Sequence, residues 1–148
     1  MKYRNLPGIS GIEYSFANQF YPDTQELIRE GSVIRAIGNF NKIPIHELGN
    51  CVVTSEVVSG QTIYTTTVKF KMIDEKEETR KLIDTIIMNP CVFLISDVYK
   101  EKYLIGIDKK PHPVFLPSFK IDELPSKLRV FEAQITYTNL FSILQVKD

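Results

Sequence analysis

The chain has 148 residues, the length of one ordinary domain, so we expect a single domain over residues 1–148. Hydrophobic residues make up 43% and charged residues 24%, a globular composition that can bury a core without a disulfide or a metal. The 18 acidic and 18 basic side chains balance, so no basic surplus favours nucleic acid, sequence-specific or general, and no apolar run approaches the ~20 residues of a membrane span.

The first third of the chain predicts short elements separated by turns. Apolar and polar residues alternate over 12–16, which indicates a strand with one buried face, and Pro7-Gly8 indicates a turn before it. Residues 22–29 predict a short helix, with an acidic cap at its start. A strand over 32–40 and a loop over 41–50 complete this region.

A long β-hairpin is the clearest pattern. Residues 50–58 are rich in β-formers, Ser59-Gly60 supplies the turn, and 61–73 form the return strand. The return strand alternates strictly, so one row of side chains faces the core and the other faces water. The predicted core row is Tyr64, Thr66, Val68, Phe70 and Met72.

The strongest helix signal predicts a helix over about residues 75–88. Asp74 and Glu77 form an Asp-x-x-Glu cap, and the acids of the first turn suit the helix dipole. Asn89-Pro90 ends the helix. Its predicted buried stripe is Leu82, Ile83, Ile86 and Ile87.

The second half predicts a further hairpin and two closing strands. The run that begins at Cys91 and continues to 98 is apolar enough to be buried on both faces, and 103–107 is its return strand. Residues 108–125 hold four prolines, which favour extended or edge positions. The closing strands are 128–137, with a bulge expected near Glu132, and 140–146.

These elements predict a mainly β fold. The architecture that fits is an antiparallel β-sandwich or a partly closed barrel with one inserted α-helix at about residues 75–88. Cys51 and Cys91 are expected to be free, buried thiols in a reducing compartment. The residues expected to be largely buried are Tyr64, Val68, Phe70, Leu82, Ile86, Phe93 and Ile95.

No motif for catalysis, cofactor binding or metal binding is present in the sequence. The only histidines, His46 and His112, do not occur in an H-x-x-x-H, H-E-x-x-H or C-x-x-C pattern. Pairing of either cysteine with either histidine has no local support. Gly8-x-x-Gly11 lacks the Lys-Ser/Thr of a phosphate loop. We therefore predict no enzyme activity, no cofactor and no metal.

The most unusual segment is the proline-rich stretch from 109 to 119. Its prolines stiffen the backbone, and bulky apolar side chains lie close together within it. Two interpretations remain open: a stiff loop folded over the chain's own core, or an apolar arm offered to a neighbouring subunit. The candidate interface residues are Lys109, Lys110, Pro111, Pro113, Phe115, Leu116 and Phe119.

A helix, a buried strand and the charged turn 99–102 are followed by Tyr103-Leu104-Ile105-Gly106, the Lys-Lys-Pro-His-Pro loop at 109–113 and two closing strands. This order resembles small virion structural proteins of tailed phages and prophages of Bacteroides-type bacteria. The resemblance covers Cys91 to Val146 best and Gly8 to Phe16 more weakly. It implies a β-sandwich component of the tail, neck or head–tail connector that forms rings around the DNA channel.

The resemblance and the missing motifs together favour a non-enzymatic virion protein that is made in the bacterial cytoplasm. Its expected partners are itself, as a ring, and neighbouring virion proteins, in a connector, tail-terminator or tail-completion role. Two alternatives stay open. One is a monomeric β-sandwich module that binds a ligand or peptide, and the other is a small enzyme whose site is assembled from distant residues. Oligomeric state separates the ring from the monomeric module.

Overall fold

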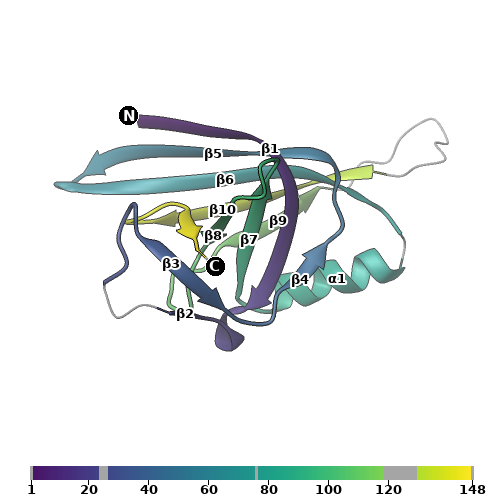
Figure 1. The fold of residues 1–148 in the computed structure, drawn as a ribbon. Helices are drawn as coiled ribbons and strands as arrows, with labels where there is room; N and C mark the ends of the chain where they lie inside the picture. The colour runs from purple at the N-terminus through teal and green to yellow at the C-terminus, as the bar shows by residue number, and fades with distance from the viewer. Residues whose placement is uncertain (1, 24–26, 76, 119–129, 148) are drawn as a thin grey trace.

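The computed structural model describes residues 2–23, 27–75, 77–118 and 130–147 (Figure 1). Within these ranges the protein is mainly β, with one α-helix and a sheet that does not close, so the prediction of a β-sandwich with one helix is confirmed. The elements are β1 (Lys2–Phe16), the 3-10 helix η1 (Ala17–Gln19), β2 (Tyr21–Asp23), β3 (Val33–Ile37), β4 (Asn41–Ile43), β5 (His46–Val58), β6 (Gln61–Ile73), α1 (Glu77–Met88), β7 (Cys91–Asp97), β8 (Lys102–Ile105), β9 (Val114–Ser118), β10 (Val130–Asn139) and β11 (Leu144–Val146).

One strand, β1, belongs to both layers of the sandwich. Its first half pairs with β5 and its second half pairs with β7, and the register shifts next to Ile9 in both ladders. Gly8 has a φ of +78°, and a Cβ added there would lie 3.1 Å from Val98 Cγ1. Both conditions favour glycine at the bend. Figure 1 shows β1 running along β5 and then turning away beside β7.

The strand order places the two layers on either side of β1. The order is β2-β3-β11-β8-β7-β1-β5-β6-β10-β9, and β4 pairs with the second half of β1. All pairs are antiparallel except β3 with β11. β7 is buried on both faces from Cys91 to Ile95, as its apolar run predicted. The aromatic ring of Phe93 stacks on Phe115 of β9, which joins the two layers across the core.

The predicted hairpin is formed by β5 and β6. Ser59 and Gly60 have φ values of 50° and 81°, as a two-residue turn with two left-handed positions requires. Val68, Phe70 and Met72 of the predicted core row are buried, and Tyr64 is half-buried. This hairpin therefore supplies one wall of the core.

The helix α1 follows β6 directly, as expected. The Thr79 hydroxyl accepts a hydrogen bond from Glu75 N at 2.8 Å and donates to Ile73 O at 3.2 Å, which ties the helix to the end of β6. Of the predicted stripe, Ile83 and Ile86 are buried and Leu82 is half-buried. Ile87 is 53% exposed, because the buried face of α1 is narrower than the apolar pattern.

The sequence was wrong about three early segments. Residues 21–23 form strand β2 and residues 27–29 have no regular structure, so the helix expected over 22–29 is not seen; residues 24–26 lie outside the described residues. The loop expected over 41–50 contains β4 and the start of β5, because β1 offers both a pairing edge. The turn at Pro7-Gly8 is a bend inside β1.

Two expectations near the C-terminus also change. The bulge expected near Glu132 is absent, because β10 pairs with β6 without a shift from Val130 to Asn139. Every second residue of β10 from Phe131 to Tyr137 is buried, so the strand alternates regularly. The last strand is shorter than predicted, and Glu30 binds the segment that precedes β11. The carboxylate of Glu30 accepts hydrogen bonds from Ser142 N at 2.6 Å and Ser142 Oγ at 2.8 Å.

We expect Phe93→Ala to lower the free energy of unfolding by about 3–5 kcal/mol, since it empties the centre of the core. Phe93 is 1% exposed. The matched control is Tyr99→Ala in the turn after β7, where the ring is 85% exposed; we expect a change within about 0.5 kcal/mol. Chemical denaturation of both variants measures the difference. A loss below about 1 kcal/mol for Phe93→Ala would contradict this description of the core.

Candidate assembly surface

The proline-rich segment singled out by the sequence starts as an exposed loop and ends as strand β9. Lys109, Lys110 and Pro111 are exposed, and Pro113 is half-buried. Gly106, with a φ of +89°, lies so close to Pro113 that an added Cβ would approach Pro113 Cγ and Cδ to 2.7 Å. This close approach fixes the direction in which the loop enters β9.

The alternation of β9 separates the two bulky residues of this segment. Phe115 is 7% exposed, and its ring centroid lies 6.2 Å from that of Phe70 and 6.4 Å from that of Phe93. Leu116 faces the other way and is 51% exposed. Phe119 lies outside the described residues. The interpretation of a loop folded over its own core therefore holds for Phe115, and the outward side chain available to a partner is Leu116.

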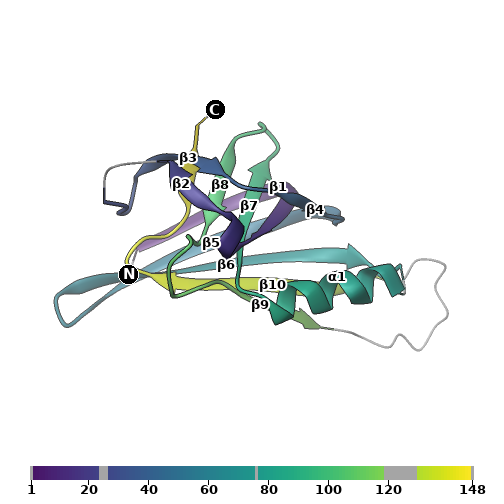
Figure 2. The same cartoon turned by 90° about the horizontal axis from the view of Figure 1, so that it is seen from below.

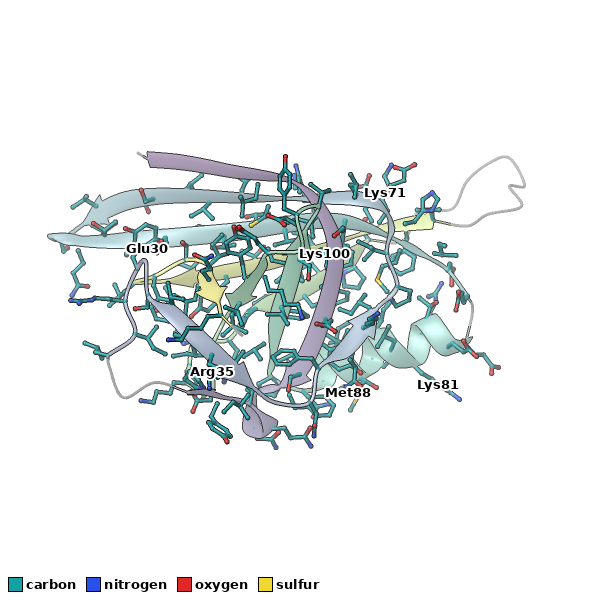
Figure 3. All side chains as sticks on the ribbon, in the orientation of Figure 1. Glu30, Arg35, Lys71, Lys81, Met88 and Lys100 are labelled. Carbon is teal, nitrogen blue, oxygen red and sulfur yellow. The ribbon has the colours of Figure 1, made fainter. Side chains whose placement is uncertain are left out.

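An apolar groove runs between α1 and β9. It has a volume of about 510 Å³, and Cys91, Phe93 and Phe115 belong to its lining. Four large apolar side chains of this α1–β9 groove are exposed to water. They are Ile87 (53%), Met88 (80%), Val114 (53%) and Leu116 (51%). Figure 3 shows Met88 at the end of α1.

The sequence did not identify the helical side of this groove. Ile87 was assigned to the buried stripe, and Met88 carried no signal of its own. The available signal was the apolar pair Ile87 and Met88 at the end of the helix. Ile83 and Ile86 already supply the core contacts of α1. Only the packing of α1 beside β9 places this pair next to Val114 and Leu116.

One buried polar atom of a groove residue lacks a hydrogen-bond partner among the described residues. This atom is His112 Nδ1, and atoms of the chain itself cover it. His112 also lines a smaller cavity of about 300 Å³ next to η1.

The cysteine in the groove is not arranged as a nucleophile. Cys91 is buried, its Sγ lies 3.3 Å from Asn89 O, and burial raises the pKa of its thiol to about 11. Cys51 is also buried, so the prediction of two free, buried thiols is confirmed. A high thiol pKa disfavours the thiolate that nucleophilic chemistry requires.

The remaining titratable residues are dispersed. His46 lies on β5, where its Nε2 is 3.6 Å from Glu47 Oε1. The part of the chain that the structure describes contains no group of three or more His, Cys, Asp or Glu residues arranged for a metal ion. It also contains no helix that is long and apolar enough to cross a membrane.

A second exposed apolar surface is the hairpin tip, which we define as residues 56–63. The ladder of β5 with β1 ends at Ser55, and the ladder of β6 with β10 ends at Tyr64, so the described neighbours do not flank the tip. Val57 is 72% exposed and Val58 is 44% exposed. The sequence predicted these valines as strand residues, and only the lengths of the neighbouring strands leave them uncovered.

The strands at the two ends of the main strand order, β2 and β9, each carry a proline. Pro22 lies in β2 and Pro117 lies in β9. A proline has no backbone N–H to offer to an added strand, and edge prolines are a common protection against edge-to-edge pairing. α1 also contacts β9. Association through backbone pairing at either edge is therefore disfavoured.

A second cavity of about 630 Å³ is lined by residues of β5, β6, β9 and β10. It lies where the register of β5 shifts against β6, and Glu47 has a φ of 65° there. Its lining includes Lys69 and Gln134, and Lys71 Nζ lies 3.6 Å from Glu47 Oε2. Figure 3 shows Lys71 on this side of the molecule.

Comparison of the chain with family models, with curated proteins and with solved structures finds no significant match.

The two faces of β9 give a matched pair of variants. We expect Phe115→Ser to cost about 3–5 kcal/mol of unfolding free energy, as for other deletions of a buried aromatic ring. Leu116→Ser, one residue later on the exposed face, should cost less than about 1 kcal/mol. Thermal melts of the two variants under conditions that keep the protein monomeric measure this difference. Equal losses would show that β9 does not have the orientation described.

The raised thiol pKa predicts slow labelling of Cys91. At about pH 8 a thiol of pKa about 11 is roughly one part in a thousand thiolate, against roughly one in ten for a thiol of pKa 9.0. An aromatic disulfide reagent should therefore react with neither cysteine of the folded protein on the timescale of free cysteine. Denaturant should release both thiols. Rapid labelling of one thiol per folded chain would contradict the burial of both cysteines.

Proposed function

We propose that this protein is a non-enzymatic structural component that assembles with copies of itself into a ring. The observation that carries the proposal is the α1–β9 groove, whose four exposed apolar side chains lie around a lining of core residues. An apolar patch of this kind is a common feature of protein interfaces.

The surroundings of the groove support self-association. Lys109 and Lys110 are exposed and come shortly before His112 and Pro113, which line the groove. A charged rim around an apolar centre is typical of specific interfaces. The zero net formal charge of the chain removes long-range repulsion between copies.

The structural class that we propose is the tail or neck of a tailed phage, as a connector, tail-terminator or tail-completion protein. The support is the order of elements from Cys91 to Val146 that resembles such virion proteins, together with a β-sandwich fold. The partners are then other copies of the chain and neighbouring virion proteins, and the location is the virion after synthesis in the bacterial cytoplasm.

A monomeric binding module is the second candidate. The observation that favours it is the cavity of about 630 Å³ lined by β5, β6, β9 and β10, where Glu47 adopts a left-handed conformation beside Lys71. Non-glycine residues in this conformation are uncommon and recur at functional sites. This candidate requires a small polar ligand and no self-association.

Oligomeric state tests the proposal. We expect light scattering and mass photometry of the purified protein to show a species of several chains that grows with concentration. Negative-stain images should show closed rings. A protein that stays monomeric over the whole concentration range would contradict the proposal and favour the binding module.

A further inference from the structure

We propose that the hairpin tip of one copy docks into the α1–β9 groove of the next copy. This inference rests on the proposed function and deepens it, because it names the two surfaces that join neighbouring subunits. The occupant of the groove is a second copy of this chain.

The hairpin tip exposes apolar side chains because it extends beyond the strands that flank β5 and β6. Val57 has the same phase along β5 as Cys51 and Val53, which are buried in the core. The flanking ladders stop before it, so Val57 is 72% exposed although it belongs to the core-facing row. Val58, on the opposite face of the strand, is 44% exposed. The tip therefore presents apolar surface on both of its faces.

The α1–β9 groove is apolar in its lining and at its rim. Phe93 and Phe115 are core residues, yet they also belong to its lining. Met88 on one side and Val114 on the other are exposed. An inserted apolar group would therefore contact core side chains and cover the exposed rim at the same time.

The charges of the two surfaces are opposite. Glu56 is an exposed acid on the hairpin tip, and Lys109 and Lys110 are exposed bases in the loop before β9. This charge pairing would orient the tip in the groove as well as attract it.

The positions of the two surfaces make the contact head-to-tail. In Figures 1 and 2 the hairpin tip and α1 lie toward opposite ends of the molecule, and the tip continues the straight strands β5 and β6. A chain in this conformation cannot fill its own groove. A contact between two different surfaces repeats from copy to copy and gives a ring when the rotation closes.

The experiment uses two single variants that each damage one surface. Val57→Lys places a charge on the tip, and Met88→Lys places one in the groove, where a cation near the end of α1 suits the helix dipole. Each variant alone should weaken association by about thirtyfold or more and keep the melting temperature of the monomer. The control is Tyr99→Lys, an equally drastic change at a ring that is 85% exposed in the turn after β7, and it should assemble like the unchanged protein.

Mixing the two variants gives the decisive result. The intact tip of the Met88→Lys chain should enter the intact groove of the Val57→Lys chain, which leaves one damaged surface at each end. Native mass spectrometry should therefore show a one-to-one heterodimer that does not grow. Variants that are each monomeric and remain monomeric when mixed would overturn the pairing of tip with groove.

Two further outcomes separate this inference from the proposed function. Normal rings in both single variants would overturn the inference and leave the proposed function standing, because the interface would then lie elsewhere. A monomeric unchanged protein would overturn both.

Reversal of charge tests the orientation. Glu56→Lys should weaken association roughly two- to fivefold at low salt, and Lys109→Glu with Lys110→Glu added to the same chain should restore it. A triple variant no better than Glu56→Lys alone would overturn the pairing of these charges.

Discussion

The structure depends on the hydrogen bonding of β1 to two different strands. Lys2–Pro7 follow β5 and Gly11–Phe16 follow β7, so one backbone passes from the first layer of the sandwich to the second. The bend at Gly8 has a backbone conformation that other residues rarely adopt, and Ile9, immediately after it, is fully buried. Because β1 is hydrogen-bonded into both layers, it sets the position of one layer relative to the other and so the shape of the core between them.

The aromatic contacts show what this geometry achieves. Phe93 of β7 meets Phe115 of β9, and Phe115 also meets Phe70 of β6, so a small cluster of rings closes the gap between layers. Two rings of this cluster, Phe93 and Phe115, also line the α1–β9 groove. The stability of the fold and the shape of the proposed interface therefore share residues. To separate an effect on assembly from an effect on folding, a variant must change an exposed side chain. Leu116 on β9 and Met88 on α1 are such positions.

The edges and the tip illustrate how the chain limits its own association. Pro22 and Pro117 remove backbone donors from β2 and β9, the strands at the two ends of the main strand order. The valines of the hairpin tip and the apolar rim of the groove remain exposed. Backbone pairing accepts almost any partner strand, whereas side-chain contact between shaped surfaces discriminates. Under the proposed function, protected edges and exposed apolar patches would direct association to a defined partner.

The sequence by itself determined the elements whose signals are local. The β5–β6 hairpin follows from strict alternation around Ser59-Gly60, α1 follows from its acidic start and Asn89-Pro90, and the burial of β7 follows from its apolar run. Tertiary structure decided everything that depends on a distant partner. β4 forms because β1 offers it a pairing edge. β2 forms in place of the start of the expected helix because β3 pairs with it. Phe115 and Leu116 differ in exposure because β9 pairs with β10 in one register. The candidate surfaces belong to this second group. The sequence assigned Ile87 to the buried stripe of the helix and Val57 to a strand, and only the positions where neighbouring elements end leave both exposed.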